Sequence, residues 1–201
     1  MIGKWNKSVI LTYLGLILSV LGIILVIFDI NIKYAMICLI FAGICDLFDG
    51  TVARRCKRTK EEKEFGIELD SLVDVISFIA LPIVILTSIN RSLLFIPLVI
   101  IYAVFAIARL AYFNIKTADS NKAIASYIGL PVTYAAMIFP LLFLLSYVLK
   151  NNVFIIIYNI ITLLVAILFV IKIKVPKPKL ISSIILLLIA IVVTVIYLFL
   201  V

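Results

Sequence analysis

The sequence has no histidine, only 3 cysteines among its 201 residues, and few charged residues, which make up 14% of the chain. Without histidine, no imidazole can bind a metal or act as a general base, so either role falls to another side chain. Cys38 and Cys45 lie in one apolar run and Cys56 in a polar segment, so we expect free thiols. The scarcity of charge, at a mean hydropathy of +1.36, excludes an ordinary soluble domain.

Long apolar runs make up most of the chain instead. Each is close to the roughly 20 residues that a helix needs to cross a membrane. The runs lack the period-two alternation of barrel strands, so they predict helices. They lie at 9–28, 33–53, 67–89, 93–114, 126–148, 152–171 and 180–201. The first run is too long for a signal peptide and lacks a cleavage site, so we expect it to remain as a span.

The predicted fold class is therefore an all-α, polytopic membrane protein. Six of the predicted spans fall within residues 1–171, which form the main membrane domain. A basic connector with two prolines, "KIKVPKPK" at 172–179, separates them from an additional helix at 180–201, which carries no charge.

The basic residues predict the orientation of the chain. With a cytoplasmic N-terminus, 14 of the 18 Lys and Arg residues fall inside, only Lys33, Arg91 and Lys150 fall outside, and Arg109 lies near the bilayer. This asymmetry on short loops is a strong positive-inside signal. The inside set is Lys4, Lys7, Arg54, Arg55, Lys57, Arg58, Lys60, Lys63, Lys116, Lys122, Lys172, Lys174, Lys177 and Lys179.

The net charge of +8 raises the question of a nucleic-acid partner. No recognition fold fits between the spans, so we expect none. In a membrane protein the same charge sets topology and attracts anionic lipid head groups. The sequence therefore favours membrane lipids as the partner of the basic segments.

Four aspartates stand out because they lie at the membrane end of apolar runs, where an ionisable group is costly. Asp46 and Asp49 are three residues apart at the end of the second run, and Asp70 and Asp74 are four apart at the start of the third. Each pair shares one helix face, and a short loop joins the two helices. We expect all four carboxylates to converge at the cytoplasmic side.

Converging carboxylates cannot all stay ionised unaided, and bound divalent cations resolve the conflict. An all-oxygen site selects hard ions, so we expect one or two Mg²⁺ or Mn²⁺ ions, with Ca²⁺ as another option. The alternative is that the pairs are solvated, or salt-bridged to the basic run at 54–63. Two facing pairs with small residues between them make the metal site the better interpretation.

Small residues and an arginine accompany the aspartates. Gly50 and Ala53 follow Asp49, and Gly66 lies one turn before Asp70, so a bulky group could approach the backbone there. Arg54 adds positive charge. Metals, an arginine and open backbone suit a pyrophosphate. For any single glycine, close helix packing in the membrane is the commoner explanation.

These residues resemble the signature of the CDP-alcohol phosphotransferase family. The pattern is Asp46-x-x-Asp49-Gly50-x-x-Ala53-Arg54, then Gly66-x-x-x-Asp70-x-x-x-Asp74. The 11 residues between Arg54 and Gly66 exceed the roughly eight that are usual in the family, an insertion that a loop absorbs easily. The resemblance covers residues 46–135, and Asn6 and Thr12 correspond loosely to polar positions near the nucleotide.

Within the family, three stretches resemble phosphatidylserine synthases. They are "FGIELDSLVDVISF" at 65–78, "ARLAYFN" at 108–114, and "GLP" at 129–131 followed by Thr133. The resemblance implies a six-helix core, a homodimer, and attack of the L-serine hydroxyl on CDP-diacylglycerol or CDP-archaeol with release of CMP. It also implies that Asp46, Asp49 and Asp70 are metal ligands and that Asp74 is the base, with a share in the second metal.

The acceptor needs a cationic site, because the serine carboxylate is recognised by arginine or by backbone N–H groups. Arg109, within an apolar stretch, is the first candidate, and its alternative is snorkelling to the head groups. Asn114 and the 129–131 turn are further candidates. Arg54, Arg55 and Lys57 could instead hold the serine carboxylate or the lipid phosphate.

Three other functions compete with serine transfer. Glycerol phosphate or inositol phosphate as acceptor would keep the chemistry but should require more basic residues at the site. A cation transporter would also use intramembrane carboxylates, but these four gather at one surface and no mid-membrane helix breaks are evident. A structural scaffold has no use for two facing acidic pairs.

Overall fold

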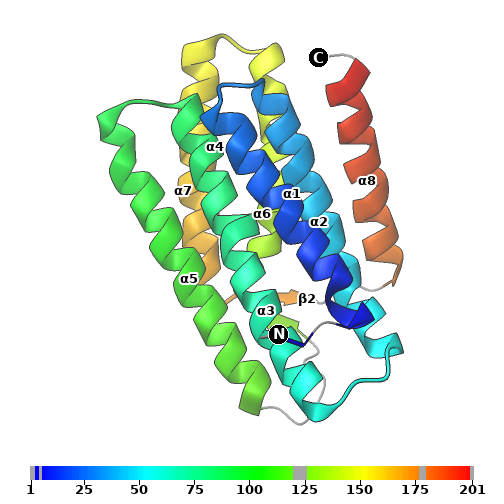
Figure 1. Ribbon diagram of the computed structural model, residues 1–201. Coiled ribbons are helices and arrows are strands. Elements are labelled where there is room, and N and C mark those ends of the chain that lie inside the picture. Colours follow the sequence, from blue (N-terminus) through cyan, green and yellow to red (C-terminus); the bar gives the residue numbers. More distant parts are fainter. Residues whose placement is uncertain (1–2, 5, 120–125, 177–179, 200–201) are drawn as a thin grey trace.

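The computed structural model describes residues 3–4, 6–119, 126–176 and 180–199, and these residues form a bundle of helices (Figure 1). The α-helices and strands are α1 Ile10–Ile27, α2 Ile32–Arg55, α3 Lys60–Val75, α4 Leu81–Ile89, α5 Ile96–Asp119, β1 Ser126–Ile128, α6 Ala135–Phe143, α7 Asn151–Val170, β2 Lys174–Pro176 and α8 Leu180–Phe199. Short 3₁₀ turns are Lys7–Val9, Leu93–Phe95, Val132–Tyr134 and Leu144–Tyr147. A π-helical segment, Ile76–Ala80, joins α3 to α4.

Six helical segments in the described part of the chain are long and apolar enough to cross a membrane. They are Lys7–Ile27, Ile32–Arg55, Lys60–Ile89, Leu93–Lys116, Asn151–Val170 and Ile181–Phe199. A seventh apolar segment, Val132–Tyr147, is shorter. The all-α, polytopic membrane class is therefore confirmed.

The fifth apolar run differs from its predicted extent, since it is not a helix throughout 126–148. Its first residues form β1, and the helix begins only at Val132. Gly129, at φ +76°, turns the chain between them, and Pro131 then precedes the first helical turn. A side chain at Gly129 would lie 2.5 Å from the carbonyl oxygen of Phe169, so the turn requires glycine.

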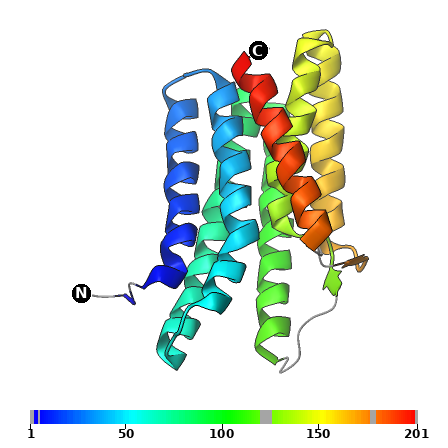
Figure 2. The ribbon, with the colours of Figure 1, turned by 90° about the vertical axis from the view of Figure 1, so that its right-hand side faces the viewer.

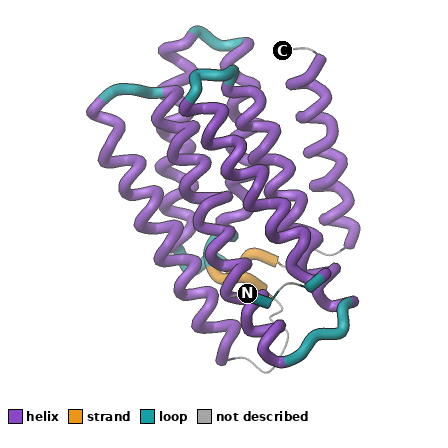
Figure 3. The backbone as a smooth tube through the Cα atoms, in the orientation of Figure 1, coloured by secondary structure: helices purple, strands orange, loops and turns teal. Residues whose placement is uncertain are grey.

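One end of the bundle, here called the basic end, carries the N-terminus, the α2–α3 loop, the end of α5 and the two strands (Figure 1). The strands form a small antiparallel sheet in which Tyr127 pairs with Val175 (Figure 3). Most of the predicted inside residues belong to these segments. Lys122, Lys177 and Lys179 lie outside the described residues.

Helix neighbours explain how the bundle holds together. α1 packs along α2, α5 along α7, and α6 and α8 both contact α2 (Figure 2). At Gly43 of α2, an added side chain would lie 2.5 Å from the Cβ of Ala136 of α6. Missing side chains let membrane helices approach closely, since packing rather than water exclusion drives their association.

The π-helical segment follows from a proline. Pro82 has no N–H to donate to the carbonyl of Phe78 four residues earlier, and the N–H of Leu81 reaches back to Ile76. The hydroxyl of Tyr102, which is fully buried, donates to the Phe78 oxygen at 2.7 Å. The aspartate-bearing half of this long helix is thereby joined to the apolar half without an unsatisfied carbonyl.

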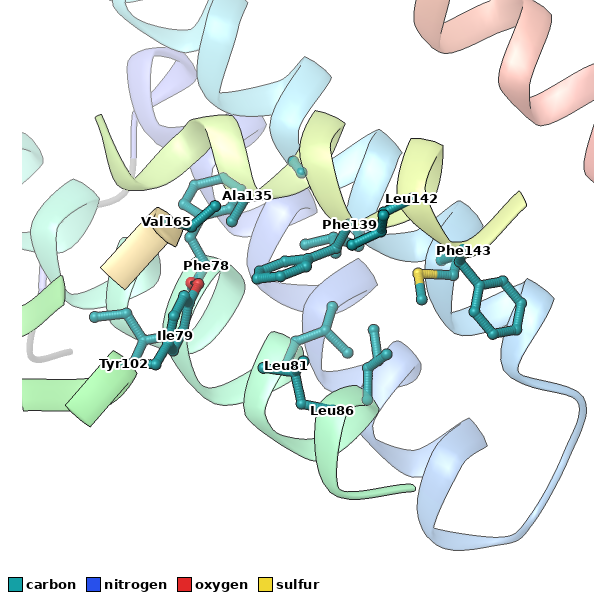
Figure 4. Close-up of a cluster of buried hydrophobic side chains, with 14 of the residues drawn as sticks. Phe78, Ile79, Leu81, Leu86, Tyr102, Ala135, Phe139, Leu142, Phe143 and Val165 are labelled. Atoms are coloured by element: carbon teal, nitrogen blue, oxygen red, sulfur yellow. The ribbon is translucent and has the colours of Figure 1, made fainter. Parts of the chain in front are cut away.

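Aromatic rings fill the space between α5, α6, α7 and α8. We call this set the aromatic core: Tyr102, Phe139, Phe143, Phe154, Tyr158, Phe169 and Tyr197. Phe139 packs against Tyr102 with ring centres 5.7 Å apart, and Phe143 against Phe154 at 5.9 Å. Figure 4 shows Tyr102, Phe139 and Phe143 among other buried hydrophobic side chains. The hydroxyl of Tyr197 donates to the carbonyl of Pro140 and so ties α8 to α6.

Candidate active site

The four aspartates converge because α2 and α3 run antiparallel from a four-residue loop at 56–59. The loop ends in a capping box, in which Thr59 and Glu62 exchange side-chain and backbone hydrogen bonds, so the start of α3 is fixed. Asp46 and Asp49 of α2 and Asp70 of α3 each bring one carboxylate oxygen within 4.8 Å of the others. The predicted meeting of the two helix faces is confirmed for these three residues.

Asp74 completes the set from one turn deeper in α3. It lies outside the group of three, but it lines the same cavity and interacts electrostatically with Asp46. Asp74 is 9% exposed and Asp49 8%, so both carboxyl groups are shielded from water by protein. Thr12 of α1 donates a hydrogen bond of 3.2 Å to Asp49, which orients that carboxylate.

The carboxylates suit a hard cation. Two oxygens bound to one ion are at most twice the metal–oxygen distance apart, about 4.2 Å for Mg²⁺ and about 5 Å for Ca²⁺. Oxygens within 4.8 Å of one another can therefore bind one such cation together after a small inward movement. Neutralising such buried like charges is what a cation would contribute here.

A cavity of about 470 Å³ opens beside the carboxylates. All four aspartates line it, together with residues of α5, the β1 segment, α6 and α8. Its polar residues are Asp46, Asp49, Thr51, Arg54, Asp70, Ser71, Asp74, Arg109, Asn114, Tyr127, Thr133, Tyr134 and Ser183. The volume falls within the range of about 300–1,000 Å³ that small-molecule sites have.

Arg109 is the buried cation of this cavity. It is 6% exposed, interacts electrostatically with Asp74 and Asp46, and lies over the ring of Phe113 at 5.0 Å. Its buried Nε has no hydrogen-bond partner in the described part of the chain. An arginine held on a ring, with a free donor, is well placed to bind an anion.

Asn114 and Tyr127 flank Arg109. The Asn114 side chain donates to Ser71 of α3 at 2.9 Å, which joins α5 to the aspartate-bearing helix. Tyr127 packs on Phe113 with ring centres 5.5 Å apart, and burial raises the pKa of its hydroxyl, which therefore stays protonated and able to donate. The small sheet at the basic end holds Tyr127 in this place.

The remaining predicted residues divide into two groups. Gly50 and Arg54 line the cavity, and Arg54 also donates to Thr51 at 3.0 Å. Arg55, Ala53 and Gly66 do not line it. A side chain at Gly66 would instead meet Val9, so this glycine faces the start of α1.

Asn6, a loose candidate, does not line the cavity and caps the turn before α1.

Several cavity residues were missed by the sequence reasoning. Tyr127 went unnoticed because nothing in its neighbourhood marks it. The α8 residues went unnoticed because they lie in a long, mostly apolar run without charge. The three cysteines are free, as expected.

The fold and the acidic cavity define a class. The family model of CDP-alcohol phosphatidyltransferases matches residues 5–200, so the chain belongs to that family. The match extends through α8.

Two curated relatives are similar to part of the chain. The "CDP-diacylglycerol--serine O-phosphatidyltransferase" of Helicobacter pylori strain ATCC 700392 / 26695 is 36% identical over 101 residues. The protein of the same name from strain J99 / ATCC 700824 is 35% identical over 101 residues. Each match covers 49% of this chain and 42% of the relative, so the similarity spans less than half of either protein.

Proposed function

We propose that this protein transfers the phosphatidyl or archaetidyl group of a CDP-linked lipid to the hydroxyl of L-serine and releases CMP. The observation that carries the proposal is the convergence of Asp46, Asp49, Asp70 and Asp74 on one cavity that also holds the buried Arg109. Family membership supports the CDP-linked donor, and the names of the two partial relatives support serine as acceptor.

The polar end of the cavity is the proposed place of the pyrophosphate. One or two divalent cations, Mg²⁺, Mn²⁺ or Ca²⁺, would be held by Asp46, Asp49 and Asp70, with Asp74 beside them. Bound there, they would neutralise the pyrophosphate and polarise the phosphorus that is attacked. Arg54, on the cavity wall next to Gly50, adds a cation that can pair with a phosphate oxygen.

In the proposed step, the serine hydroxyl oxygen forms a bond to the lipid-side phosphorus while the bond from that phosphorus to the CMP oxygen breaks. The hydroxyl proton passes to a carboxylate, because the chain has no histidine to receive it. Asp74 is the proposed base, since it lies one turn deeper than Asp70 and adjoins Arg109 as well as Asp46. The products are a phosphatidylserine-like lipid and CMP.

Arg109 is proposed to bind the serine carboxylate, with the phosphate of the lipid as the alternative ligand. Its unpartnered Nε and its place on the wall shared with Asp74 would bring the serine hydroxyl near the base. Asn114 and Tyr127 can supply further hydrogen bonds to the same small zwitterion.

The proposed orientation places the cavity at the cytoplasmic face of the cell membrane. The basic residues of the α2–α3 loop surround the aspartate-bearing helix ends, and such residues collect on the cytoplasmic side. Homodimerisation and the division of the chain at residues 171 and 180 stay predictions.

The central test is CMP release by the purified protein from a CDP-linked lipid. We expect release only with both serine and a divalent cation, and its loss on adding EDTA with recovery on adding excess Mn²⁺ or Mg²⁺. Release that needs no serine, or that survives EDTA, would contradict the proposal.

The acceptor is tested in the same assay. Glycerol phosphate and inositol phosphate replace serine at equal concentration, and we expect neither to support CMP release. A faster reaction with either phosphate ester would keep the chemistry and replace the acceptor. Cation uptake into vesicles in the absence of any CDP-lipid would instead favour the transporter.

A further inference from the structure

Helix α8 carries one stripe of residues that changes character along its length. Val193 and Tyr197 are buried in the protein core, and the Tyr197 ring packs on Phe143. Toward the basic end, the same stripe continues with Ala190, Leu186 and Ser183, at spacings of four and three residues, and these line the cavity of the aspartates. The C-terminal half of α8 thus packs into the protein core, while its N-terminal half, nearer the basic end, forms part of the cavity wall.

Another part of the cavity wall belongs to α2 and α6. On α2, Ile40, Ile44 and Leu47 lie at helical spacing and lead from the aspartates into the bundle. Ile40 is six residues from Asp46, which places it about 9 Å deeper along the helix. Met137 of α6 completes an apolar compartment that is continuous with the polar one.

The depth of this compartment matters because it lies within helices long enough to span a membrane. A ligand that fills both ends must be ionic at one end and apolar at the other. Water-soluble serine and CMP have no group that would fill the apolar end. A CDP-linked lipid does, because the glycerol esterified to the attacked phosphate carries hydrocarbon chains.

We propose that α8, together with α2 and α6, forms the binding site for the hydrocarbon chain of the CDP-linked donor, and that Leu186 sets the width of that site. The proposal rests on the proposed function for the identity of the donor. It assigns the near half of α8 a role that an ordinary membrane-spanning helix would not have.

The charge-free composition of α8 fits this role. The stripe of Ser183, Leu186 and Ala190 offers two small side chains on either side of one large one, so the large one decides the free width. On other faces of the same helix, Ile185 and Leu188 are 51% and 56% exposed and so face the surrounding lipid. These faces supply matched control positions.

The first experiment compares donors by chain length. Leu186→Trp narrows the compartment, and Leu188→Trp adds the same group on a lipid-facing side. We expect L186W to lower kcat/KM for a CDP-lipid with long chains about tenfold more than for one with six-carbon chains. L188W should treat both donors as the unsubstituted protein does.

Opposite results are equally informative. An equal loss with both donors in L186W, or no loss with either, would overturn the role of α8 while leaving the proposed function standing. Failure of the unsubstituted protein to release CMP from either donor would contradict the proposed function itself. Leu186→Ala, which widens the compartment, should raise the relative rate with a methyl-branched chain, and an unchanged ratio would also count against the site.

A second readout does not depend on turnover. A CDP-lipid with a photoreactive diazirine in its chain is bound with Mn²⁺ but without serine, illuminated, and mapped by peptide mass spectrometry. Crosslinks at Ser183, Leu186 or Ala190 that unlabelled CDP-lipid suppresses are expected. Crosslinks confined to Ile185 and Leu188, or insensitive to competitor, would show a chain in bulk lipid and overturn the proposal.

Discussion

The cavity and the aromatic core lie in one bundle but differ in charge and in packing. The cavity gathers four carboxylates and Arg109 around open space. The aromatic core fills its space with rings, of which Tyr102, Tyr158 and Tyr197 are among the largest fully buried side chains. Both regions share α5, α6 and α8, so one helix can carry chemistry on one part and packing on another.

The difference shows where stability resides in this protein. Between membrane helices, association depends on close packing and hydrogen bonds, because lipid is as apolar as the side chains. The aromatic core supplies such contacts, whereas the carboxylates repel one another until a cation binds. Substitutions in the cavity should therefore affect activity far more than stability, and substitutions in the core should do the reverse.

The sharpest separation is expected at Asp70. Asp70→Asn removes the negative charge of one of the three converging carboxylates. The rate of CMP release should then fall about a thousandfold or more. The melting temperature of the detergent-solubilised protein should stay the same or rise, while its increase on adding Mn²⁺ disappears. Asp29→Asn, at an exposed ion pair with Arg91, is the control and should retain activity. If CMP release survived in both Asp70→Asn and Asp74→Asn, the proposed metal site would be contradicted.

Phe139 tests the other region. Phe139→Ala leaves a void among the rings of the aromatic core. The packing lost around that void should by itself lower the free energy of unfolding by about 2–3 kcal/mol. Phe199→Ala deletes the same atoms from a side chain that is 80% exposed, so it should change stability little. Reversible unfolding in mixed detergent measures both. A similar loss in both variants would mean that burial of Phe139 contributes nothing special.

Arg109 is the buried positive charge of the cavity wall. Arg109→Ala should raise the KM for serine about tenfold and the KM for the CDP-lipid much less, if the guanidinium binds the serine carboxylate. Equal increases would assign Arg109 a structural role, and a larger effect on the CDP-lipid would point to the lipid phosphate. Arg91→Ala, at the exposed pair with Asp29, serves as the control for a lost positive charge.

The smallest effect is expected at Tyr102. Tyr102→Phe keeps the ring in the aromatic core but leaves the Phe78 carbonyl without its 2.7 Å hydrogen bond. Hydrogen bonds between membrane helices are worth roughly 0.6–2 kcal/mol, so we expect a loss of about 1 kcal/mol in unfolding free energy. Calorimetry or unfolding in mixed detergent would measure it. No loss of stability would mean that the carbonyl finds another donor.

Much of the fold was readable from the sequence because membrane spans are marked by length and composition alone. The convergence of Asp46, Asp49 and Asp70 was also predictable, since spacing fixes the helix face and a short loop fixes the partner. The start of α6 was not, because hydropathy does not register the turn at Gly129 that diverts residues 126–128 into a strand.

The wall of the site was less accessible to sequence reasoning. Gly66 matches the signature, yet it faces Val9 and not the cavity, because its role depends on how α1 meets α3. Leu186 sits in the stretch 184–193, where every residue is apolar, so nothing there distinguishes the cavity face from the lipid face. Such distinctions come from tertiary packing, which one sequence does not encode locally.

The wide turn at Ile76–Ala80 determines the rotational phase between the two halves of one 30-residue span. Each residue advances an α-helix by about 100°, and a π turn takes up one residue more than an α turn, so winding the same residues as a regular α-helix would rotate one half against the other by up to about that amount. With α4 fixed in the bundle, Asp70 and Asp74 would swing away from α2. The π-helical segment between Pro82 and the aspartates thus sets the direction in which the acidic face of α3 points.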